Sequence, residues 1–192
     1  MTAVAIVPAA GSAERFGGRK LLADVDGEPL VARTLAALLP HVARAVVVLG
    51  PDGAELRALP ALRQAKVSVA LNPDPARGML SSIQAGLAAV DWADAYLVIP
   101  ADMPFLRGET VRQIVERQAC TSGGIVSPSY RGKRGHPVAL PARLREEVLA
   151  EETGHTLHDV IRRHTDLRED LVVDDAGVIR DVDTIDDLDR SR

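Results

Sequence analysis

Short apolar segments alternate with longer amphipathic segments along most of the chain, and this alternation is the strongest constraint on its fold. The apolar segments are rich in valine and isoleucine and are not polar at alternate positions; they cover residues 3–7, 45–49, 67–71, 95–99, and 125–126 with their neighbours. Strands with this pattern are covered on both faces. We therefore predict a buried, mostly parallel β-sheet.

Segments with helical periodicity fall between the predicted strands. Leu30, Leu35 and Leu38 have helical spacing after Pro29, a residue that suits the first helical position. Further helices are predicted over residues 79–90, 108–118, 142–149 and 156–163. Alternating strands and helices indicate an α/β fold built from right-handed βαβ units, in which ligands bind beyond the carboxyl ends of the strands.

The alternation weakens after Val138, where we expect antiparallel edge strands and surface helices. A length of 192 residues suits one domain, and no linker or repeat divides residues 1–192. The net charge of −4 argues against non-specific nucleic-acid binding. One cysteine, Cys120, suits a reducing compartment, and no apolar run is long enough for a bilayer. With no basic region before the first strand, we expect no signal peptide and a cytoplasmic protein.

The loop after the first strand combines glycines with cations over residues 8–20, PAAGSAERFGGRK. Small residues let the backbone approach a ligand and point N–H groups at it, which suits phosphate. Arg15 and Lys20 add positive charge, and Arg19 is a further candidate. The spacing matches neither a P-loop nor the G-x-G-x-x-G of dinucleotide folds. A flexible basic turn has the same composition.

Three motifs together resemble the MobA/MocA-type nucleotidyltransferases, which transfer GMP or CMP to the molybdopterin cofactor. The first is Ala9-Ala10-Gly11 with Arg15, Gly17, Lys20, Leu21-Leu22 and Gly27-x-Pro29-Leu30. The second, from Asn72 to Ile83, resembles the N-P-x-x-x-x-G-M-x-x-S segment of cytidylyl-transferring members, and the third is Asp102-Met103-Pro104. The chain departs from the family at Ala13, where serine is usual, and at Phe16, where methionine is usual.

The resemblance implies a Rossmann-like three-layer α/β/α sandwich, similar to nucleotide-diphospho-sugar transferases, and a nucleotide site in the first two motifs. The implied nucleotide-binding residues are Ala9, Ala10, Gly11, Lys20, Asn72, Gly78, Ser81 and Ser82. Serines at the start of a helix also serve as caps. Guanylyl-transferring members carry a second glycine in the segment Ala9-Ala10-Gly11, so alanine there favours CTP.

Asp102 follows a predicted strand, and a carboxylate at that position suits Mg²⁺ shared with substrate phosphates. A turn or helix cap is the alternative role for this aspartate. The C-terminal segment around Asp183-Thr184 resembles the family's D-[IV]-D-T-x-x-D-L ending, which makes Asp183 a second candidate metal ligand. Acidic runs near a chain end are also commonly solvated surface.

The segment Arg131 to Pro137 resembles the family's G-x-R-G-H-P motif. This resemblance implies that Arg134, Gly135 and His136 bind the acceptor. An exposed basic hairpin is the alternative. His155 and His158 have i, i+3 spacing, but no third ligand is evident, so a surface pair is the simpler interpretation. Residues 151–156, EETGHT, lack the arginine of the family's G-D-x-G-A-R-like stretch, which leaves the acceptor open.

These features predict transfer of a nucleoside monophosphate to a phosphorylated acceptor, with Lys20 and Arg15 neutralising the departing pyrophosphate and Asp102 holding Mg²⁺. Molybdopterin is the implied acceptor and a molybdenum hydroxylase apoenzyme the implied partner. Sugar or sugar-acid nucleotidyltransferases share the fold, and a non-catalytic chaperone that delivers cofactor is a third reading. The glycine spacing argues against a flavin or nicotinamide oxidoreductase.

Overall fold

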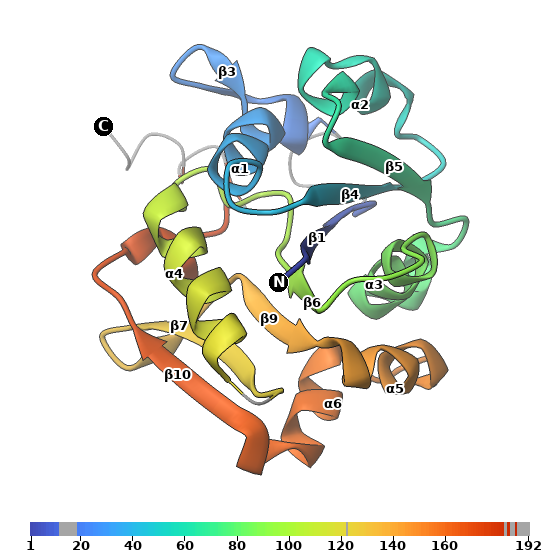
Figure 1. Cartoon of the computed structure of the whole chain (residues 1–192). Coiled ribbons are helices and arrows are strands. Elements are labelled where there is room, and N and C mark those ends of the chain that lie inside the picture. The colour runs from blue at the N-terminus through green and yellow to red at the C-terminus, as the bar shows by residue number, and fades with distance from the viewer. Residues whose placement is uncertain (12–18, 122, 183, 185–186, 188–192) are drawn as a thin grey trace.

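A computed structural model describes residues 1–11, 19–121, 123–182, 184 and 187 (Figure 1). The strands are β1 (Ala3–Ala9), β2 (Asp24–Val25), β3 (Glu28–Pro29), β4 (Arg44–Leu49), β5 (Val67–Leu71), β6 (Ala95–Val98), β7 (Ile125–Tyr130), β8 (Lys133–Arg134), β9 (Val138–Pro141) and β10 (Arg168–Val172). The α-helices are α1 (Leu30–Leu38), α2 (Ala54–Ala58), α3 (Met79–Ala88), α4 (Gly108–Cys120), α5 (Arg145–Ala150) and α6 (Leu157–Arg163). Arg15 and Asp183 lie outside the described residues.

The main sheet has the strand order β10-β7-β9-β6-β1-β4-β5, with β8 paired to β7. β1 pairs in parallel with both β4 and β6, β4 pairs in parallel with β5, and β10 pairs in parallel with β7. The predicted α/β class and mostly parallel sheet are therefore confirmed. β2 and β3 form a separate antiparallel hairpin before α1.

The position of the antiparallel strand differs from the prediction. β9 was expected among edge additions, but it lies inside the sheet and runs against both β6 and β7. Its residues Val138 to Pro141 are all buried. Its short apolar sequence fits a central strand as well as an edge strand, so the sequence pattern alone does not choose between the two.

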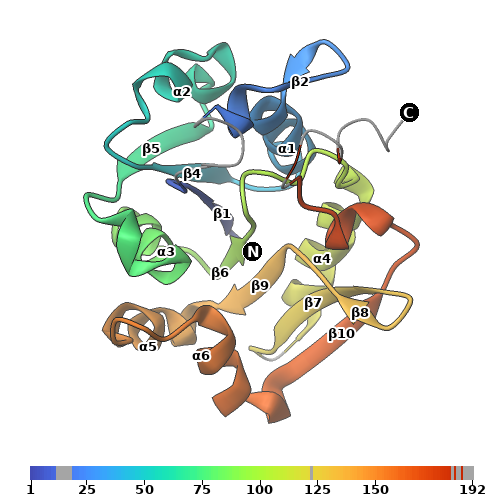
Figure 2. The same ribbon diagram turned by 180° about the vertical axis from the view of Figure 1, so that it is seen from behind.

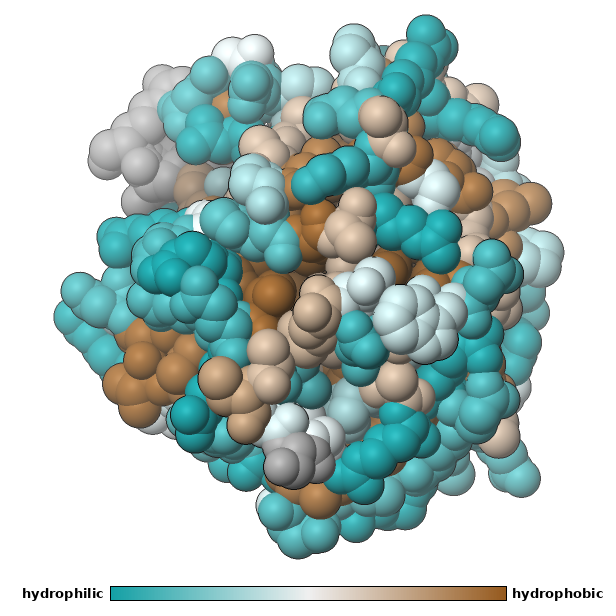
Figure 3. All heavy atoms as spheres, viewed as in Figure 1, coloured by the Kyte–Doolittle hydropathy of each residue, from teal (hydrophilic) through white to brown (hydrophobic). Residues whose placement is uncertain are grey.

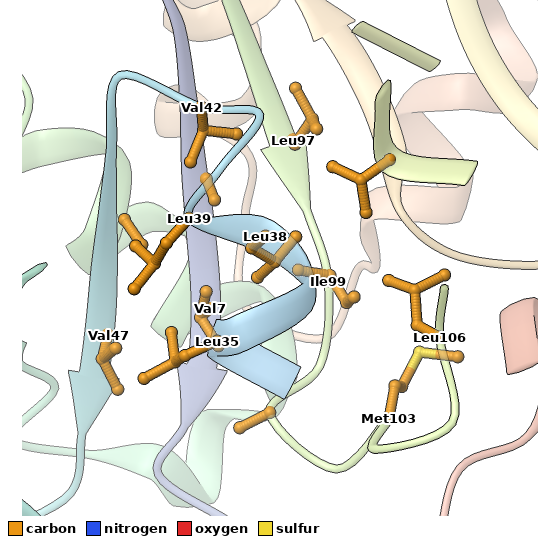
Figure 4. Packing of buried hydrophobic residues seen from close by; sticks show 14 of the residues in the cluster. Val7, Leu35, Leu38, Leu39, Val42, Val47, Leu97, Ile99, Met103 and Leu106 are labelled. Atoms are coloured by element: carbon orange, nitrogen blue, oxygen red, sulfur yellow. The ribbon is translucent and has the colours of Figure 1, made fainter. Parts of the chain in front are cut away.

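Alternate residues of each central strand enter two separate cores. In β1, Val7 packs on one face with Leu35 and Leu38 of α1, which are fully buried (Figure 4). Ile114 of α4 belongs to the same buried cluster. On the other face, Ile6 packs in the core that includes residues of α3, α5 and α6. The helices thus form layers on the two sides of the sheet, as predicted for a three-layer sandwich (Figures 1 and 2).

The predicted helix starts are one residue early in two places. Pro29 is the N-cap residue of α1 and the last residue of β3, and the helix begins at Leu30. Thr156 caps α6 in a capping box with Asp159. The predicted helix over 142–149 is a 3₁₀ turn followed by α5. Such shifts are common because helix ends are set by local hydrogen bonds that periodicity does not report.

One aspartate of the C-terminal acidic run is structural and not solvated surface. Asp175 is 3% exposed, and its carboxylate accepts hydrogen bonds from the Arg107 backbone N–H and the Thr110 hydroxyl at the start of α4. It also accepts one from the Gly177 N–H. Asp175 therefore fastens the C-terminal segment to α4 and places it across the end of the sheet.

Hydrophilic residues cover much of the face seen in Figure 3, with apolar atoms visible between them. Among the described residues, no helix is long and apolar enough to cross a membrane.

Close packing of α3 on the sheet predicts the effect of a single added methyl group. A Cβ atom at Gly86 would lie 2.6 Å from the Ile6 Cγ2 atom and 2.9 Å from the Val48 Cγ2 atom. We expect Gly86→Ala to destabilise the fold by about 1–2 kcal/mol, since overpacking outweighs the gain in helix propensity. Denaturant unfolding measures this change. Ala88→Val adds bulk on the exposed side of α3 and serves as control; equal stability of Gly86→Ala and wild type would contradict the packing.

Candidate active site

Parallel pairing brings the loops after β1 and β6 to one edge of the sheet. The Ala101 N–H donates to the Pro8 carbonyl at 3.1 Å, so Ala9-Ala10-Gly11 and Asp102 belong to neighbouring loops. The loop before α3 meets them there. These three loops are the ones that carry the sequence motifs.

A cavity of about 280 Å³ lies among these loops. Its lining includes most of the residues predicted to bind nucleotide or metal: Ala9, Ala10, Gly11, Lys20, Gly78, Ser82 and Asp102. We call it the first cavity. Its lining combines backbone and small side chains with an ion pair.

The ion pair joins Lys20 and Asp102, with the Nζ atom 2.6 Å from the Oδ2 atom. The Lys20 side chain is 11% exposed and that of Asp102 is 20% exposed. Both charges are largely shielded from water, so their attraction offsets part of the cost of burying them. The pair therefore places a cation and an anion side by side in the wall of the first cavity.

Backbone hydrogen bonds hold the Asp102 loop in place. The Thr34 hydroxyl donates to the Ala101 carbonyl at 3.0 Å, and the Val182 N–H donates to the Asp102 carbonyl at 3.1 Å. α4 begins only at Gly108, with Arg107 as its N-cap residue, so Asp102 is not a helix cap. Its carboxylate is oriented by the turn and by Lys20.

The loop from Asn72 to Gly78 is held together by the Asn72 amide. Asn72 is 3% exposed and donates to the hydroxyls of Ser81 and Ser82 at 2.8 and 2.9 Å. Gly78 has φ +94°, a conformation that favours glycine. Ser82 lines the first cavity, whereas Asn72 and Ser81 do not. These two residues position the loop from behind.

A second cavity of about 470 Å³ adjoins the first, and Gly78 and Met79 line both. Apolar residues of α3, α6, β6 and β9 form much of its surface: Leu80, Ile83, Leu157, Ile161, Val98 and Val138. Its polar side chains include three arginines and three histidines: Arg77, Arg134, Arg168, His136, His155 and His158. The described lining residues include no aspartate or glutamate, so the cavity is apolar with a cationic boundary.

The residues predicted for acceptor binding all line the second cavity. Arg134 is held by Asp170, whose two carboxylate oxygens each lie 2.8 Å from the Nε atom. A Cβ atom at Gly135 would lie 1.9 Å from the Val178 carbonyl oxygen, so only glycine fits there. Burial lowers the pKa of His136, while the carboxylates of Asp102 and Asp181 act in the opposite direction.

Sequence reasoning missed part of this cavity. His155 and His158 are exposed, as a surface pair would be, but they also line the second cavity. Arg168 is in no motif, and its place was not predicted. His155 precedes the Thr156 cap of α6, so the predicted helical i, i+3 relation to His158 does not hold. No sequence signal marks Arg168.

The residues present fit a divalent cation at Asp102. The Asp102 Oδ1 atom is buried and has no hydrogen-bond partner within the described part of the chain. Such an oxygen has a lone pair available for a hard cation. No cluster of three histidine, cysteine or acidic residues occurs within the described ranges. A site there would use few protein ligands, as Mg²⁺ shared with phosphates does.

Burial of His136 predicts a measurable titration. In metal-free protein we expect its NMR-determined pKa to lie below the ordinary 6.5, because desolvation disfavours the imidazolium. Asp102→Asn should lower this pKa further, since it removes a charge that favours protonation. Folding then disfavours the protonated form, so the contribution of His136 to stability falls as pH drops below 6.5. Asp91→Asn, at an exposed position, is the control; a pKa at or above 6.5 would contradict the burial.

Comparison with known proteins places this arrangement among nucleotidyltransferases. The chain is 26% identical over 183 residues to the molybdenum cofactor cytidylyltransferase of Escherichia coli K12, covering 95% of this chain and 92% of that protein. It is 31% identical over 193 residues to the nicotine blue oxidoreductase of Paenarthrobacter nicotinovorans, covering 95% and 93%.

The fold is also shared with a solved structure. A Mycobacterium tuberculosis H37Rv protein superposes with a TM-score of 0.84 over 100% of this chain and 98% of that one, at 24% identity. The model of the MobA-like NTP transferase domain matches residues 5–167, a range that contains both cavities apart from Arg168. The chain belongs to the MobA-like NTP transferase family.

Proposed function

We propose that the protein transfers a nucleoside monophosphate, CMP from CTP, to a phosphorylated acceptor, with release of pyrophosphate. The observation that carries this proposal is the pair of cavities joined at Gly78 and Met79. One cavity has the small residues and the ion pair that suit a triphosphate. The other has the apolar surface and cations that suit an acceptor with a ring system and a phosphate.

In the first cavity, Ala9, Ala10 and Gly11 let the nucleotide approach the backbone, and the Ser82 hydroxyl supplies a polar contact. Lys20 faces the phosphates and compensates the charge that develops on the leaving pyrophosphate. Arg15, which lies outside the described residues, is proposed for the same task. Asn72 and Ser81 act by holding the loop that carries Gly78.

The reaction begins when an oxygen of the acceptor phosphate attacks the α-phosphorus of the nucleotide. A new P–O bond forms as the bond to the β-phosphate bridging oxygen breaks, and pyrophosphate leaves. The attacking oxygen is already anionic at neutral pH, so the residues present need to hold and orient both substrates more than to move protons. Burial lowers the pKa of His136, which favours the neutral imidazole and suits a positioning role beside the acceptor.

Asp102 is the proposed Mg²⁺ ligand. Asp183, which lies outside the described residues, is a second candidate, because the backbone N–H of the preceding residue, Val182, donates a hydrogen bond to the Asp102 carbonyl. When bound, the metal would neutralise phosphate charge as a Lewis acid.

Molybdopterin is the proposed acceptor. The similarity to a molybdenum cofactor cytidylyltransferase supports it, and a flat ring system with a phosphate matches the apolar, cationic second cavity. Arg134, Gly135 and His136 are proposed to bind this acceptor. A molybdenum hydroxylase apoenzyme is the proposed recipient of the product.

The direct test incubates the protein with Mg²⁺, each NTP in turn and molybdopterin, and measures pyrophosphate. Release that requires both CTP and acceptor is the expected result. Release with sugar phosphates in place of molybdopterin would favour the sugar nucleotidyltransferase reading. Binding of CTP without release with any acceptor would favour a chaperone.

The ion pair predicts the effect of removing either charge. We expect Lys20→Ala and Asp102→Asn each to lower kcat by about 100-fold or more, because each removes charge from the site of phosphate transfer. Since either change leaves one buried charge, thermal unfolding is measured in parallel. Arg57→Ala and Asp91→Asn change exposed charges elsewhere and serve as controls. Wild-type turnover in a folded variant would remove that residue from the mechanism.

Ala10 predicts base selectivity. It lines both the first cavity and a neighbouring one formed with Gly50 to Gly53. We expect Ala10→Gly to raise the ratio of kcat/KM for GTP over CTP by about tenfold, the usual scale for one methyl group in a pocket. Ala88→Gly, on the exposed side of α3, is the control. An unchanged ratio would show that base choice lies elsewhere.

The name of one relative supplies a second candidate. Nicotine blue oxidoreductase is similar over 95% of this chain, so a redox activity on an aromatic substrate in the second cavity is the alternative reaction class. The glycine spacing of the first loop still argues against a dinucleotide cofactor. Oxidation of NADH or NADPH in the presence of nicotine blue, without pyrophosphate release from any NTP, would favour this candidate.

A further inference from the structure

Arg168 is a shielded cation in the wall of the second cavity. It is the first residue of β10, and its side chain is 13% exposed. Pairing of β10 with β7 places Arg168 opposite Ile125, while Asp170 lies opposite Ser127. Val98 and Val138, which form part of the cavity's surface, are paired with each other in the row that contains Ser127 and Asp170. Arg168 therefore lies two residues nearer than Asp170 to the amino ends of the parallel strands.

The charge of Arg168 is poorly compensated by the protein. Its ion-pair partner is Asp170, at 3.7 Å between Nε and Oδ1, and Asp170 already accepts from Arg134 through both oxygens. The Nε atom of Arg168 is buried without a hydrogen-bond partner in the described part of the chain. Burial, and then the nearby charge of Arg134, lower the pKa of Arg168. A shielded cation in this state is unfavourable until an anion joins it.

Arginines with a structural role in this protein have better partners. Arg145 is also largely shielded, and its Nε atom likewise has no hydrogen-bond partner among the described residues, but its Nη2 atom donates to the carbonyls of Leu87 and Val90. Arg143 donates to the Gly123 carbonyl at 2.6 Å. Within the described residues Arg168 donates no comparable bond, although it lines a cavity large enough for a ligand.

Arg168 begins β10, whereas Gly78 follows the carboxyl end of β5, so the two lie toward opposite ends of the parallel strands. Leu80 and Ile83 of α3 and Val138 of β9 line the second cavity together with Arg168. Gly78 and Met79 line both this cavity and the first. An occupant that reacts at Gly78 therefore lies along apolar side chains and meets Arg168 with a different part of its structure.

We propose that Arg168 binds an anionic oxygen group of the molecule that occupies the second cavity. This inference rests on the proposed function: the acceptor would present its reactive phosphate near Asp102 and a second negatively charged or ionisable oxygen group to Arg168. The group is a phosphate or a carboxylate, and Arg168 selects for it as a specificity-determining residue.

The test measures binding and does not depend on turnover. 2-Naphthyl phosphate, 2-naphthoate and 2-naphthol share one apolar ring system and differ in charge, so their dissociation constants are measured by calorimetry with and without CTP and Mg²⁺. The variants are Arg168→Gln, Arg168→Lys and, as a control, Arg162→Gln, which removes an exposed charge from α6.

We expect Arg168→Gln to weaken binding of the phosphate or the carboxylate by about tenfold or more, the scale of a lost charge-assisted hydrogen bond. Arg168→Lys should retain part of the affinity, and neither change should alter binding of 2-naphthol. Whichever of the two anions binds more tightly identifies the group, phosphate or carboxylate, that Arg168 binds. Arg162→Gln should bind all three like the wild type.

Equal affinity of wild type and Arg168→Gln for both anions would overturn the proposal. So would a loss of 2-naphthol binding as large as the loss of anion binding, because that indicates damaged packing. Wild-type protein that binds neither anion more tightly than 2-naphthol would also overturn it. Anion binding that depends on Arg168 in a protein that releases no pyrophosphate would uphold this inference while rejecting nucleotidyl transfer.

Discussion

Parallel pairing of β1 with β4 and β6 is the constraint on which the rest of this structure depends. Because the three strands run in one direction, the segments that follow them meet at one edge, and Lys20 and Asp102, far apart in the chain, come within 2.6 Å. The two apolar faces of the strands hold this register by packing against helices on both sides. The charged pair is therefore supported by two cores and not by local sequence.

Polar side chains behind the cavities provide the remaining support. Asn72 joins the loop before α3 to Ser81 and Ser82, Thr34 holds the backbone beside Asp102, and Asp175 fastens the C-terminal segment to α4. A buried polar group is costly unless it is bonded, so each of these residues specifies one arrangement of its loop. In the described part of the chain, these hydrogen bonds hold the loops within the protein itself, and loops held in this way need less ordering on binding.

The two cavities differ in the charge of the side chains that line them. The first is lined by an ion pair of opposite charges, Lys20 with Asp102, beside small residues. The second carries arginines and histidines over an apolar surface, although the chain as a whole has a net charge of −4. Local positive charge in an acidic protein favours an anionic ligand at that place alone. Relatives named for cytidylyl transfer and for an oxidoreductase are both similar to this chain over 95% of its length, so family similarity alone does not specify the reaction.

The sequence by itself determined five strands of the parallel sheet, most of the helices between them and the loops that carry the motifs, because apolar periodicity and glycine placement act over short distances. It also predicted that Lys20, Gly78 and Asp102 would share a site, since carboxyl ends of parallel strands meet. It did not predict β10, which pairs in parallel with β7, or the short helix α2. Only the tertiary structure decided that β9 enters the sheet between β6 and β7, that Asn72 turns inward, and that Arg168 reaches the cavity beside His155. These outcomes depend on which distant elements pack together. Contacts between residues far apart in the chain produce no periodic pattern in the sequence, so the sequence alone does not reveal them.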